Sequence, residues 1–442
     1  MVSDADAIAA VVLEEFRKLP AKRKPAVRDN GLHEWVPLSG IVAKGSNFLK
    51  CVALATGMKC LPASKLSQAN GVAIHDWHAE VLALRCFNRF LLDECNRLAQ
   101  DSNAQSEFII RNSSQKQFPP FTWRREVTLH MYCSEAPCGD ASMELTMAAQ
   151  TDSSPWESPP AASIPSSNPA TSSPEPTPLP ESTVTLLGRG YFSHLGIVRR
   201  KPARGDAPPT MSKSCSDKIA LKQCTSLLSS LTSLFVSPSH VYLSSLVLPE
   251  SQYSATGCTR CFGFDADSAP SKGRMSSLLH KSWDGYKATP FNVVTTEQEF
   301  DYSKKIITER TSSTDKIAAS NLAKKQKTGG GVEEGLIGGV LQGRKSFDIK
   351  GASAVSRRKM WALALEVAQA LAAAEREEEE QQVRGGMDLL LSEQGLGAGT
   401  YDGVKDGDLM RERRQVKDDV RREALKGWLR NTGDGGFSPT SS

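Results

Sequence analysis

The sequence predicts a protein of the α/β class, and three observations support this. Two apolar segments, 35–42 and 48–56, are separated by a short polar turn and have the composition of paired β-strands. Segment 78–98 carries apolar residues at helical spacing. A further apolar segment, 127–132, is followed by a turn, a cysteine and a second helical pattern at 141–149. Strands and helices therefore alternate, which is typical of an α/β fold.

A helix is expected at the amino end, before these elements. Ser3 can cap this helix by accepting a hydrogen bond, and Pro20 cannot continue it. One face is apolar and is formed by Ile8, Val11, Val12, Phe16 and Leu19. We expect that face to be buried.

Residues 151–182 are expected to be a disordered insertion. They are dominated by Pro, Ser, Thr and Ala and contain too few large apolar side chains to form a core. Beyond them the patterns predict a strand, a helix, a second strand, a flexible loop and two further helices, at 191–199, 216–235, 241–247, 312–331, 353–383 and 407–429. We predict that 1–442 form one domain that contains this insertion and this loop.

The composition is that of a soluble globular protein, with 39% hydrophobic and 24% charged residues. The ten cysteines show no disulfide framework, which favours a reducing intracellular compartment, the cytoplasm or the nucleus. Segment 1–19 lacks the pattern of a secretory signal, and no apolar run is long enough to span a membrane. We expect neither membrane association nor an obligate protein partner.

The net charge of +4 excludes a uniformly polycationic protein, so any contact with nucleic acid has to come from local basic clusters. Two such clusters occur, one at 199–204 and one at 411–422. Clusters of this kind are more often a solvated face than a binding site, by roughly two to one.

His78, Glu80, Cys138 and Cys215 are the residue types of a zinc-dependent hydrolytic deaminase. One imidazole and two thiolates can hold Zn²⁺ in a tetrahedral site whose fourth position is open to water. Zinc lowers the pKa of such a water from about 16 to about 7. A nearby carboxyl group, here Glu80, can then carry a proton to the adenine or cytosine ring and to the departing ammonia. Both cysteines precede predicted helices, whose dipoles favour the thiolate form.

Each part of this constellation is weak by itself. His-Ala-Glu at a helix start occurs by chance in many proteins, and the usual Pro-Cys-x-x-Cys is absent because Ala141 stands three residues after Cys138. Cys215 is therefore the candidate third ligand. Cys258 and Cys261 lack a second pair at zinc-finger spacing, and we interpret them as buried or incidental cysteines.

Four segments match a known family in their order and spacing as well as in their motifs. They are HDWHAEVLALRCFNRFL at 75–91, APCGDASM at 136–143, VRRKPARGD at 198–206 and SKSCSDKIA at 212–220. Together they resemble the tRNA-specific adenosine deaminase family, in particular its fungal branch, which shares its catalytic domain with the adenosine deaminases acting on double-stranded RNA. The resemblance implies a cytidine-deaminase-like α/β/α sandwich with a carboxy-terminal helical extension. It also implies conversion of adenosine 37 of an alanine tRNA to inosine.

The resemblance further implies roles for individual residues. It makes His78, Cys138 and Cys215 the zinc ligands and Glu80 the proton shuttle. It implies a buried inositol hexakisphosphate, with Asp76 as a relay between this cofactor's site and the metal site. The residues that match the family's cofactor contacts are Lys59, Arg85, Lys218, Arg357, Tyr401, Lys405 and Trp428. Buried cations need a partner, and a polyphosphate can serve several at once.

The substrate surface is predicted from charge. Arg199, Arg200 and Arg204 precede Cys215 in the chain and can supply phosphate contacts to tRNA. Two alternatives to a tRNA deaminase stay open, a deaminase of other structured RNA and a catalytically silent RNA-binding protein that keeps a structural zinc. A structural zinc site usually has four protein ligands, whereas a catalytic one has three.

Overall fold

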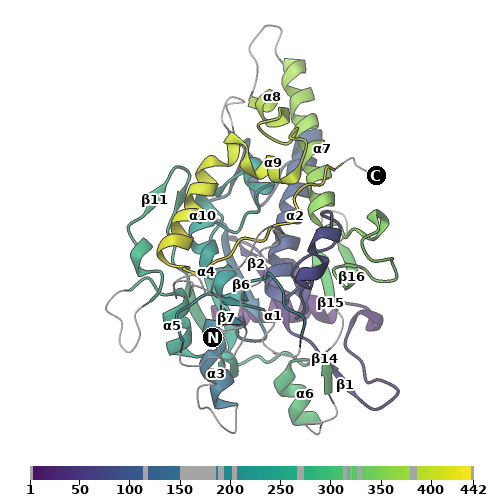
Figure 1. The fold of residues 1–442 in the computed structure, drawn as a ribbon, viewed down its shortest axis with the longest axis vertical. Helices are drawn as coiled ribbons and strands as arrows, with labels where there is room; N and C mark the ends of the chain where they lie inside the picture. The colour runs from purple at the N-terminus through teal and green to yellow at the C-terminus, as the bar shows by residue number, and fades with distance from the viewer. Residues whose placement is uncertain are drawn as a thin grey trace, which may run out of the picture.

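A mixed sheet of eight strands lies at the centre of the computed structural model (Figure 1). The structure describes residues 3–112, 118–149, 186–187, 194–201, 207–265, 273–311, 316–318, 321–325, 331–378 and 386–439. In spatial order the strands are β13 (Asn292–Thr296), β10 (Leu243–Pro249), β6 (Thr128–Cys133), β2 (Leu38–Lys44), β3 (Leu49–Thr56), β15 (Asn321–Lys325), β16 (Val332–Ile337) and β17 (Val340–Leu341). The predicted α/β class is confirmed.

Strand directions divide this sheet into two parts. β13, β10 and β6 run parallel to one another, and all the other neighbouring strands are antiparallel. β2 and β3 form the predicted hairpin, with Leu38 opposite Thr56. Both strands are almost wholly buried because helices cover both faces of the sheet at this point.

The helix α1 (Asp4–Arg17) covers one face of the sheet, as its apolar pattern predicts. The Ser3 hydroxyl caps it by accepting a hydrogen bond from the backbone N–H of Asp6 at 3.1 Å. Its buried face packs on Leu38 and Leu54 of the hairpin and on Phe300. The expected amphipathic helix is therefore confirmed.

The helix α2 (Ala79–Gln100) lies on the opposite face and is buried along most of its length. The helix α7 (Arg357–Glu378) lies alongside it (Figure 1). Two arginines of α2 hold the residues just before α7, since Arg85 donates to the carbonyl oxygen of Val355 at 2.9 Å and Arg89 donates to that of Ala354 at 2.8 Å. The carboxy-terminal part of the chain is thereby attached to the helix that follows His78.

A group of helices from the end of the chain completes the molecule. They are α8 (Gly386–Leu391), α9 (Tyr401–Asp406) and α10 (Arg411–Glu423), drawn in yellow-green to yellow in Figure 1. Trp361 of α7 donates its indole N–H to the carbonyl oxygen of Leu396 at 3.1 Å, and Tyr401 stacks on Phe437 with ring centroids 5.2 Å apart. These contacts fix α9 and the final segment against α7.

The remaining elements are short and mostly lie in connections. The helices are α3 (Met143–Ala148), α4 (Cys215–Thr225), α5 (Ala255–Phe262) and α6 (Lys304–Arg310). The strands are β1 (His33–Trp35), β4 (Ile109–Arg111), β5 (Phe121–Trp123), β7 (Leu186–Leu187), β8 (Arg199–Arg200), β9 (Val236–Ser237), β11 (Ser282–Trp283), β12 (Tyr286–Lys287) and β14 (Lys316–Ala318). In the described part of the chain, no helix is both long and apolar enough to cross a membrane.

Several predicted boundaries are wrong. The loop expected at 312–331 contains β14, which pairs with β1, and the whole of β15, which pairs with β3 in the central sheet. The strand expected at 191–199 is reduced to β8 at 199–200, residues 191–193 lying outside the described residues. The helices expected at 216–235 and 407–429 are shorter than predicted, as the bounds of α4 and α10 show, and the helix expected at 353–383 begins only at Arg357, residues 379–383 lying outside the described residues. The insertion expected at 151–182 lies outside the described residues.

Candidate metal centre

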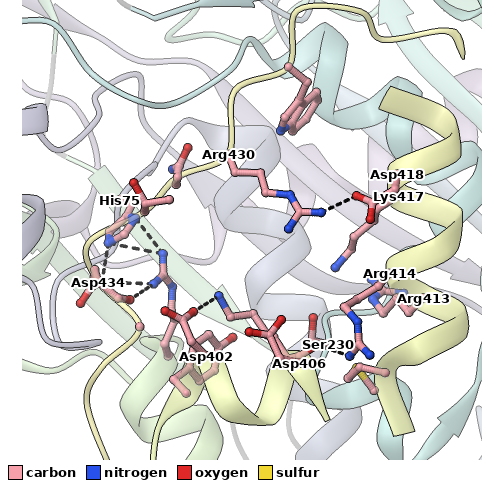
Figure 2. Close-up of a pocket in the computed structure, with 18 of the residues that line it drawn as sticks. His75, Ser230, Asp402, Asp406, Arg413, Arg414, Lys417, Asp418, Arg430 and Asp434 are labelled. Carbon is pink, nitrogen blue, oxygen red and sulfur yellow. Dashed lines mark hydrogen bonds and ion pairs between the residues drawn. The ribbon is translucent and has the colours of Figure 1, made fainter. Parts of the chain in front are cut away.

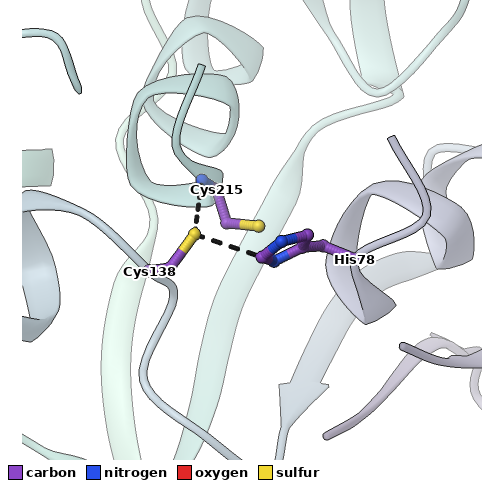
Figure 3. Close-up of side chains that lie close together, drawn as sticks. All are labelled: His78, Cys138 and Cys215. Atoms are coloured by element: carbon purple, nitrogen blue, oxygen red, sulfur yellow. Dashed lines mark hydrogen bonds between the residues drawn. The ribbon is translucent and has the colours of Figure 1, made fainter. Parts of the chain in front are cut away.

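His78, Cys138 and Cys215 converge although they are far apart in the sequence. Their potential ligand atoms all lie within 4.8 Å of one another. The Sγ atom of Cys138 is 3.8 Å from Nδ1 of His78 and accepts a hydrogen bond from the backbone N–H of Cys215 at 3.4 Å. Figure 3 shows the two thiols and the imidazole pointing toward a common point.

Helix starts position two of these three side chains. His78 is the last residue before α2 and has extended backbone angles, and Cys215 is the first residue of α4. The hydroxyl of Ser214 caps α4 by accepting a hydrogen bond from the backbone N–H of Asp217 at 3.1 Å. Both α2 and α4 therefore direct their amino-terminal ends at the cluster, and the partial positive charge there favours a thiolate.

A turn after β6 positions the third side chain, Cys138. The next residue, Gly139, has φ +107°, which side chains rarely allow. A Cβ atom at this glycine would lie 2.3 Å from Oγ of Ser214. The backbone N–H of Ser216 donates to the carbonyl oxygen of Cys138 at 3.0 Å. The turn that carries Cys138 and the start of α4 are therefore in direct contact.

These side chains fit zinc. Zinc bonds of about 2.0 Å to nitrogen and about 2.3 Å to sulfur, at a tetrahedral angle, place the nitrogen and the sulfur about 3.5 Å apart. The distance of 3.8 Å between Cys138 Sγ and His78 Nδ1 is close to that value. One imidazole and two thiolates are also the donor set of zinc deaminases. We conclude that the three residues form a candidate zinc site.

The electrostatics of the cluster favour anionic sulfur. The pKa of Cys138 is well below its usual value, first because the Cys215 thiol donates a hydrogen bond to it and also because Lys201 and His78 lie nearby. The Cys215 pKa is raised by its burial and by the hydrogen bond that it gives to Cys138. Of the two cysteines, Cys138 is therefore the thiolate and Cys215 keeps a proton, which lies between the two sulfur atoms. A divalent cation bound at this position would replace that proton.

Glu80 lies in the first turn of α2, two residues after His78, and is 6% exposed. Its burial raises the pKa of its carboxyl group, and the negative charge of Cys138 adds to this effect. A carboxyl group with a raised pKa holds a proton more readily near neutral pH. Glu80 is therefore a candidate for the group that transfers protons at this site.

A buried lysine connects the metal centre to the predicted relay residue. Lys201 donates to Sγ of Cys215 at 3.2 Å and to Oδ2 of Asp76 at 2.8 Å. Asp76 also accepts hydrogen bonds from Lys218 and from the hydroxyl of Ser212, and its pKa is well below the usual value because these cations outweigh its burial. Sequence reasoning identified Asp76 and Lys218 but missed Lys201, which lies inside the motif VRRKPARGD without a signal of its own.

A second group of potential ligands adjoins the first. Cys60, Asp76 and His78 also offer ligand atoms within 4.8 Å of one another. Asp76 already pairs with two ammonium groups, those of Lys201 and Lys218, so its oxygens are engaged. We therefore assign the metal to the group that contains Cys138 and Cys215.

A basic pocket of about 330 Å³ lies beyond Asp76, between α9, α10 and the final segment of the chain (Figure 2). Among the described residues it is lined by nine Lys or Arg and four Asp side chains. The cations are Lys213, Lys218, Arg357, Lys405, Arg413, Arg414, Lys417, Arg421 and Arg430, and the carboxylates are Asp402, Asp406, Asp418 and Asp434. Cations therefore outnumber carboxylates around this pocket.

Burial and the neighbouring cations lower the pKa of two lysines of the pocket, Lys213 and Lys417. Burial, together with the charges of Lys218 and Arg421, lowers the pKa of Lys213 to about 7. Burial and the neighbouring Arg413 and Arg421 hold the pKa of Lys417 well below its usual value. A bound polyanion would remove this mutual repulsion.

The structure places five of the seven predicted cofactor residues at this pocket, namely Lys218, Arg357, Tyr401, Lys405 and Trp428. Lys59 is exposed and Arg85 is directed at Val355, and neither belongs to the lining. Residues of the basic cluster 411–422 also line the pocket. From its charge alone, this cluster was more often expected to be a solvated face. Arg413, one of its members, is 3% exposed and donates to the carbonyl oxygen of Thr225 at 2.8 Å.

The two described residues of the predicted RNA-binding cluster are not fully exposed. Arg199 is 1% exposed, and its backbone N–H donates to Asp217 at 2.9 Å, so its side chain is buried here; its contact with RNA phosphates stays a prediction. Arg200 is half-buried, and burial lowers its pKa. Arg204 lies outside the described residues. In the same motif, Lys201 contacts the candidate metal centre.

The fold and the site together indicate a class of protein, that of α/β proteins with a candidate three-ligand metal site and a buried carboxyl group two residues from one of the ligands. Residues 53–432 match the family model described as the adenosine-deaminase (editase) domain. The chain belongs to this family, which confirms the resemblance found in its sequence motifs.

Individual relatives agree with that assignment. The chain is 35% identical to tRNA-specific adenosine deaminase 1 of Schizosaccharomyces pombe over 82% of its own length and 86% of the relative. It is 35% identical to the Saccharomyces cerevisiae protein of the same name over 55% of this chain and 58% of the relative. A shorter match, 30% identical over 31% of this chain and 19% of the relative, is to the double-stranded RNA-specific editase Adar of Drosophila melanogaster. The protein is thus a homologue of the tRNA-specific adenosine deaminases.

Proposed function

We propose that this protein deaminates adenosine to inosine in tRNA by zinc-dependent hydrolysis, and that its target is adenosine 37 of alanine tRNA. The observation that carries this proposal is the convergence of His78, Cys138 and Cys215 next to the buried carboxyl group of Glu80. The printed names of the two yeast relatives support tRNA as the substrate class. Helices on both faces of the central sheet support the deaminase-like α/β/α core.

Each residue of the site has a distinct part in this reaction. His78, Cys138 and Cys215 would hold zinc, which supplies an activated water at neutral pH when it is bound. Glu80 would take up one proton of the attacking water and pass it to the ring nitrogen of the purine, where it stays; it would then carry the second proton, from the added hydroxyl group, to the leaving ammonia. Three protein ligands, rather than four, suit this catalytic role.

We also propose that the basic pocket holds inositol hexakisphosphate. The fit rests on the excess of cations over carboxylates in the lining, and the pKa values of Lys213 and Lys417, which burial and neighbouring cations lower, agree with it. Lys218, Arg357 and Lys405 would bind phosphate groups. Lys218 also bonds to Asp76, so the cofactor and the metal centre would share one chain of contacts.

Inosine formation on alanine tRNA tests the catalytic proposal. Purified protein should bind one zinc per chain and convert adenosine 37, and Glu80→Ala should keep the zinc but lose the conversion. Glu94→Gln is a matched control, because Glu94 is a buried glutamate of the same helix, about 21 Å further along its axis. This control should remain active.

The other outcomes distinguish the alternatives. Conversion of duplex RNA but not of tRNA would indicate a deaminase of another structured RNA. Zinc binding without conversion of any RNA, together with a fourth protein ligand on the metal, would indicate a silent RNA-binding protein with a structural zinc.

A further inference from the structure

The two cysteine turns share a feature that metal binding alone does not explain. Cys138 is followed two residues later by Asp140, and Cys215 is followed two residues later by Asp217. Both aspartates are 0% exposed. A buried carboxylate is costly unless a cation and hydrogen bonds compensate it.

Arg260 of α5 compensates the first carboxylate. Its Nε–H donates to Oδ2 of Asp140 at 3.1 Å, and its Nη2–H donates to the backbone carbonyl oxygen of Asp140 at 3.0 Å. The same guanidinium binds Glu144 of α3 with both of its terminal nitrogens. Arg260 therefore holds the backbone of the Cys138 turn as well as its charged side chain.

Arg274 compensates the second carboxylate. Its Nη1–H donates to Oδ1 of Asp217 at 2.7 Å, and its Nε–H donates to the carbonyl oxygen of Cys261 at 2.9 Å. The backbone N–H of Arg274 donates to the carbonyl oxygen of Arg260 at 3.0 Å. The two arginines are thus joined directly, and each one holds a different cysteine turn.

The turns that they hold also contact each other. The Ser216 hydroxyl donates to the carbonyl oxygen of Pro137 at 2.9 Å, and it accepts a hydrogen bond from the backbone N–H of Ala141 at 3.2 Å. A small shift between the turns would therefore change the distance between the two sulfur atoms. When such shifts displace the ligands of a metal site, the site binds its metal more weakly and the enzyme loses activity.

We propose that Arg260 and Arg274 are positioning residues of the metal centre, which set the separation of the Cys138 and Cys215 thiolates through Asp140 and Asp217. This inference rests on the proposed function. Buried ion pairs often add little stability compared with apolar residues of similar size, so their presence in both cysteine turns fits a role in geometry. Neither arginine touches the substrate or the metal in this role.

The rate of zinc release distinguishes a positioning role of the two arginines from a role in the stability of the fold alone. Arg260→Met and Arg274→Met should release zinc to a chelator about 10- to 100-fold faster than the wild-type protein. With Co²⁺ in place of zinc, both variants should show a changed sulfur-to-cobalt charge-transfer band. Arg260→Lys and Arg274→Lys keep the positive charge but lose the paired N–H donors of the guanidinium, so they should release zinc at a rate between those of the wild type and the methionine variants. If the methionine variants fail to fold, the lysine variants should still fold and can be measured in their place.

Lys324→Met is the matched control. Lys324 is a nearly buried cation between two carboxylates, those of Glu15 at 2.9 Å and Glu333 at 3.4 Å, and it lies on the side of the sheet that α1 covers, away from His78. Its loss should lower the melting temperature but leave zinc release and the cobalt spectrum as in the wild type.

Two results would overturn the proposal. Arg260 and Arg274 variants that lose thermal stability as Lys324→Met does, with unchanged zinc release and cobalt spectrum, would show that the arginines only stabilise the fold. Wild-type protein that binds no zinc would remove the centre that they are said to position. If instead the variants release zinc quickly but the wild type forms no inosine, the positioning role stands and the proposed deaminase function fails.

Discussion

The ammonium group of Lys201 lies 3.2 Å from the sulfur of Cys215, and both residues are buried. Lys201 also donates to Asp76, which in turn binds Lys218 at the edge of the basic pocket. A continuous series of charge-assisted hydrogen bonds therefore runs from the metal centre to the proposed polyphosphate site. With a metal bound, a thiolate at Cys215 would be balanced by this fixed cation rather than by solvent.

Replacing Lys201 should impair the metal centre. Lys201→Met keeps the length of the side chain but leaves Cys215 and Asp76 without their shared cation, so we expect zinc affinity or kcat to fall by about 10- to 100-fold. Chelator competition and the rate of inosine formation measure the two effects. If the variant kept the activity and zinc affinity of the wild type, Lys218 alone would be sufficient to balance the charge of Asp76, and Lys201 would not be needed at the metal centre.

Binding of inositol hexakisphosphate should depend on pH through Lys213. The pKa of this lysine is about 7, because it is buried beside Lys218 and Arg421, and a bound polyanion stabilises its protonated form. Binding then takes up a proton above pH 7, and affinity should fall by up to about tenfold for each pH unit above that value. The rise in melting temperature caused by the ligand, measured from pH 6 to pH 9, tests this. Lys213→Met should bind more weakly and lose most of this pH dependence.

Gly139 should not tolerate a side chain. Gly139→Ala places a Cβ atom 2.3 Å from Oγ of Ser214 at φ +107°, so we expect a loss of at least about 3 kcal/mol in the free energy of unfolding together with loss of zinc. Gly338→Ala is the control, since Gly338 also has a positive φ of +62° but has no atom within 4 Å of the added Cβ. It should cost about 1 kcal/mol. Equal effects of the two changes in urea denaturation would show that contact with Ser214 is unimportant.

The sequence indicated the metal ligands because each has a local signal. His78 and Cys215 begin helices with apolar periodicity, and Cys138 follows a strand and a proline. Lys201, Arg260 and Arg274 have no such signal, since their partners are remote in the chain. Asp76, for example, is 125 positions from Lys201. Contacts of this kind depend on the assembled fold.

Contacts between segments that are distant in the chain also explain which predictions from the sequence were wrong. The region 312–331 is rich in Lys and Gly, which predicts a loop, yet β15 gains strand structure from its antiparallel pairing with β3, where Ala323 lies opposite Ala55. Similarly, Arg413 belongs to a charged helix that composition assigns to the surface. It is buried because its guanidinium satisfies the carbonyl oxygens of Thr225 and Leu228 next to the basic pocket.

His75 should make the protein sensitive to acid. Arg357 donates to its Nδ1 at 2.7 Å, and its Nε2 bonds to Asp434 at 2.6 Å, so a second ring proton would displace Arg357. Burial and the charge of Arg357 lower the pKa of His75 from 6.5 to about 4. Below pH 6.5 the unfolded chain therefore binds the proton first, and stability falls as pH drops from 6.5 to 4, by at most about 3 kcal/mol from this residue. Urea denaturation of His75→Gln should show a shallower decline over this range, whereas the exposed His280→Gln should follow the wild type. Parallel curves for all three proteins would contradict the prediction.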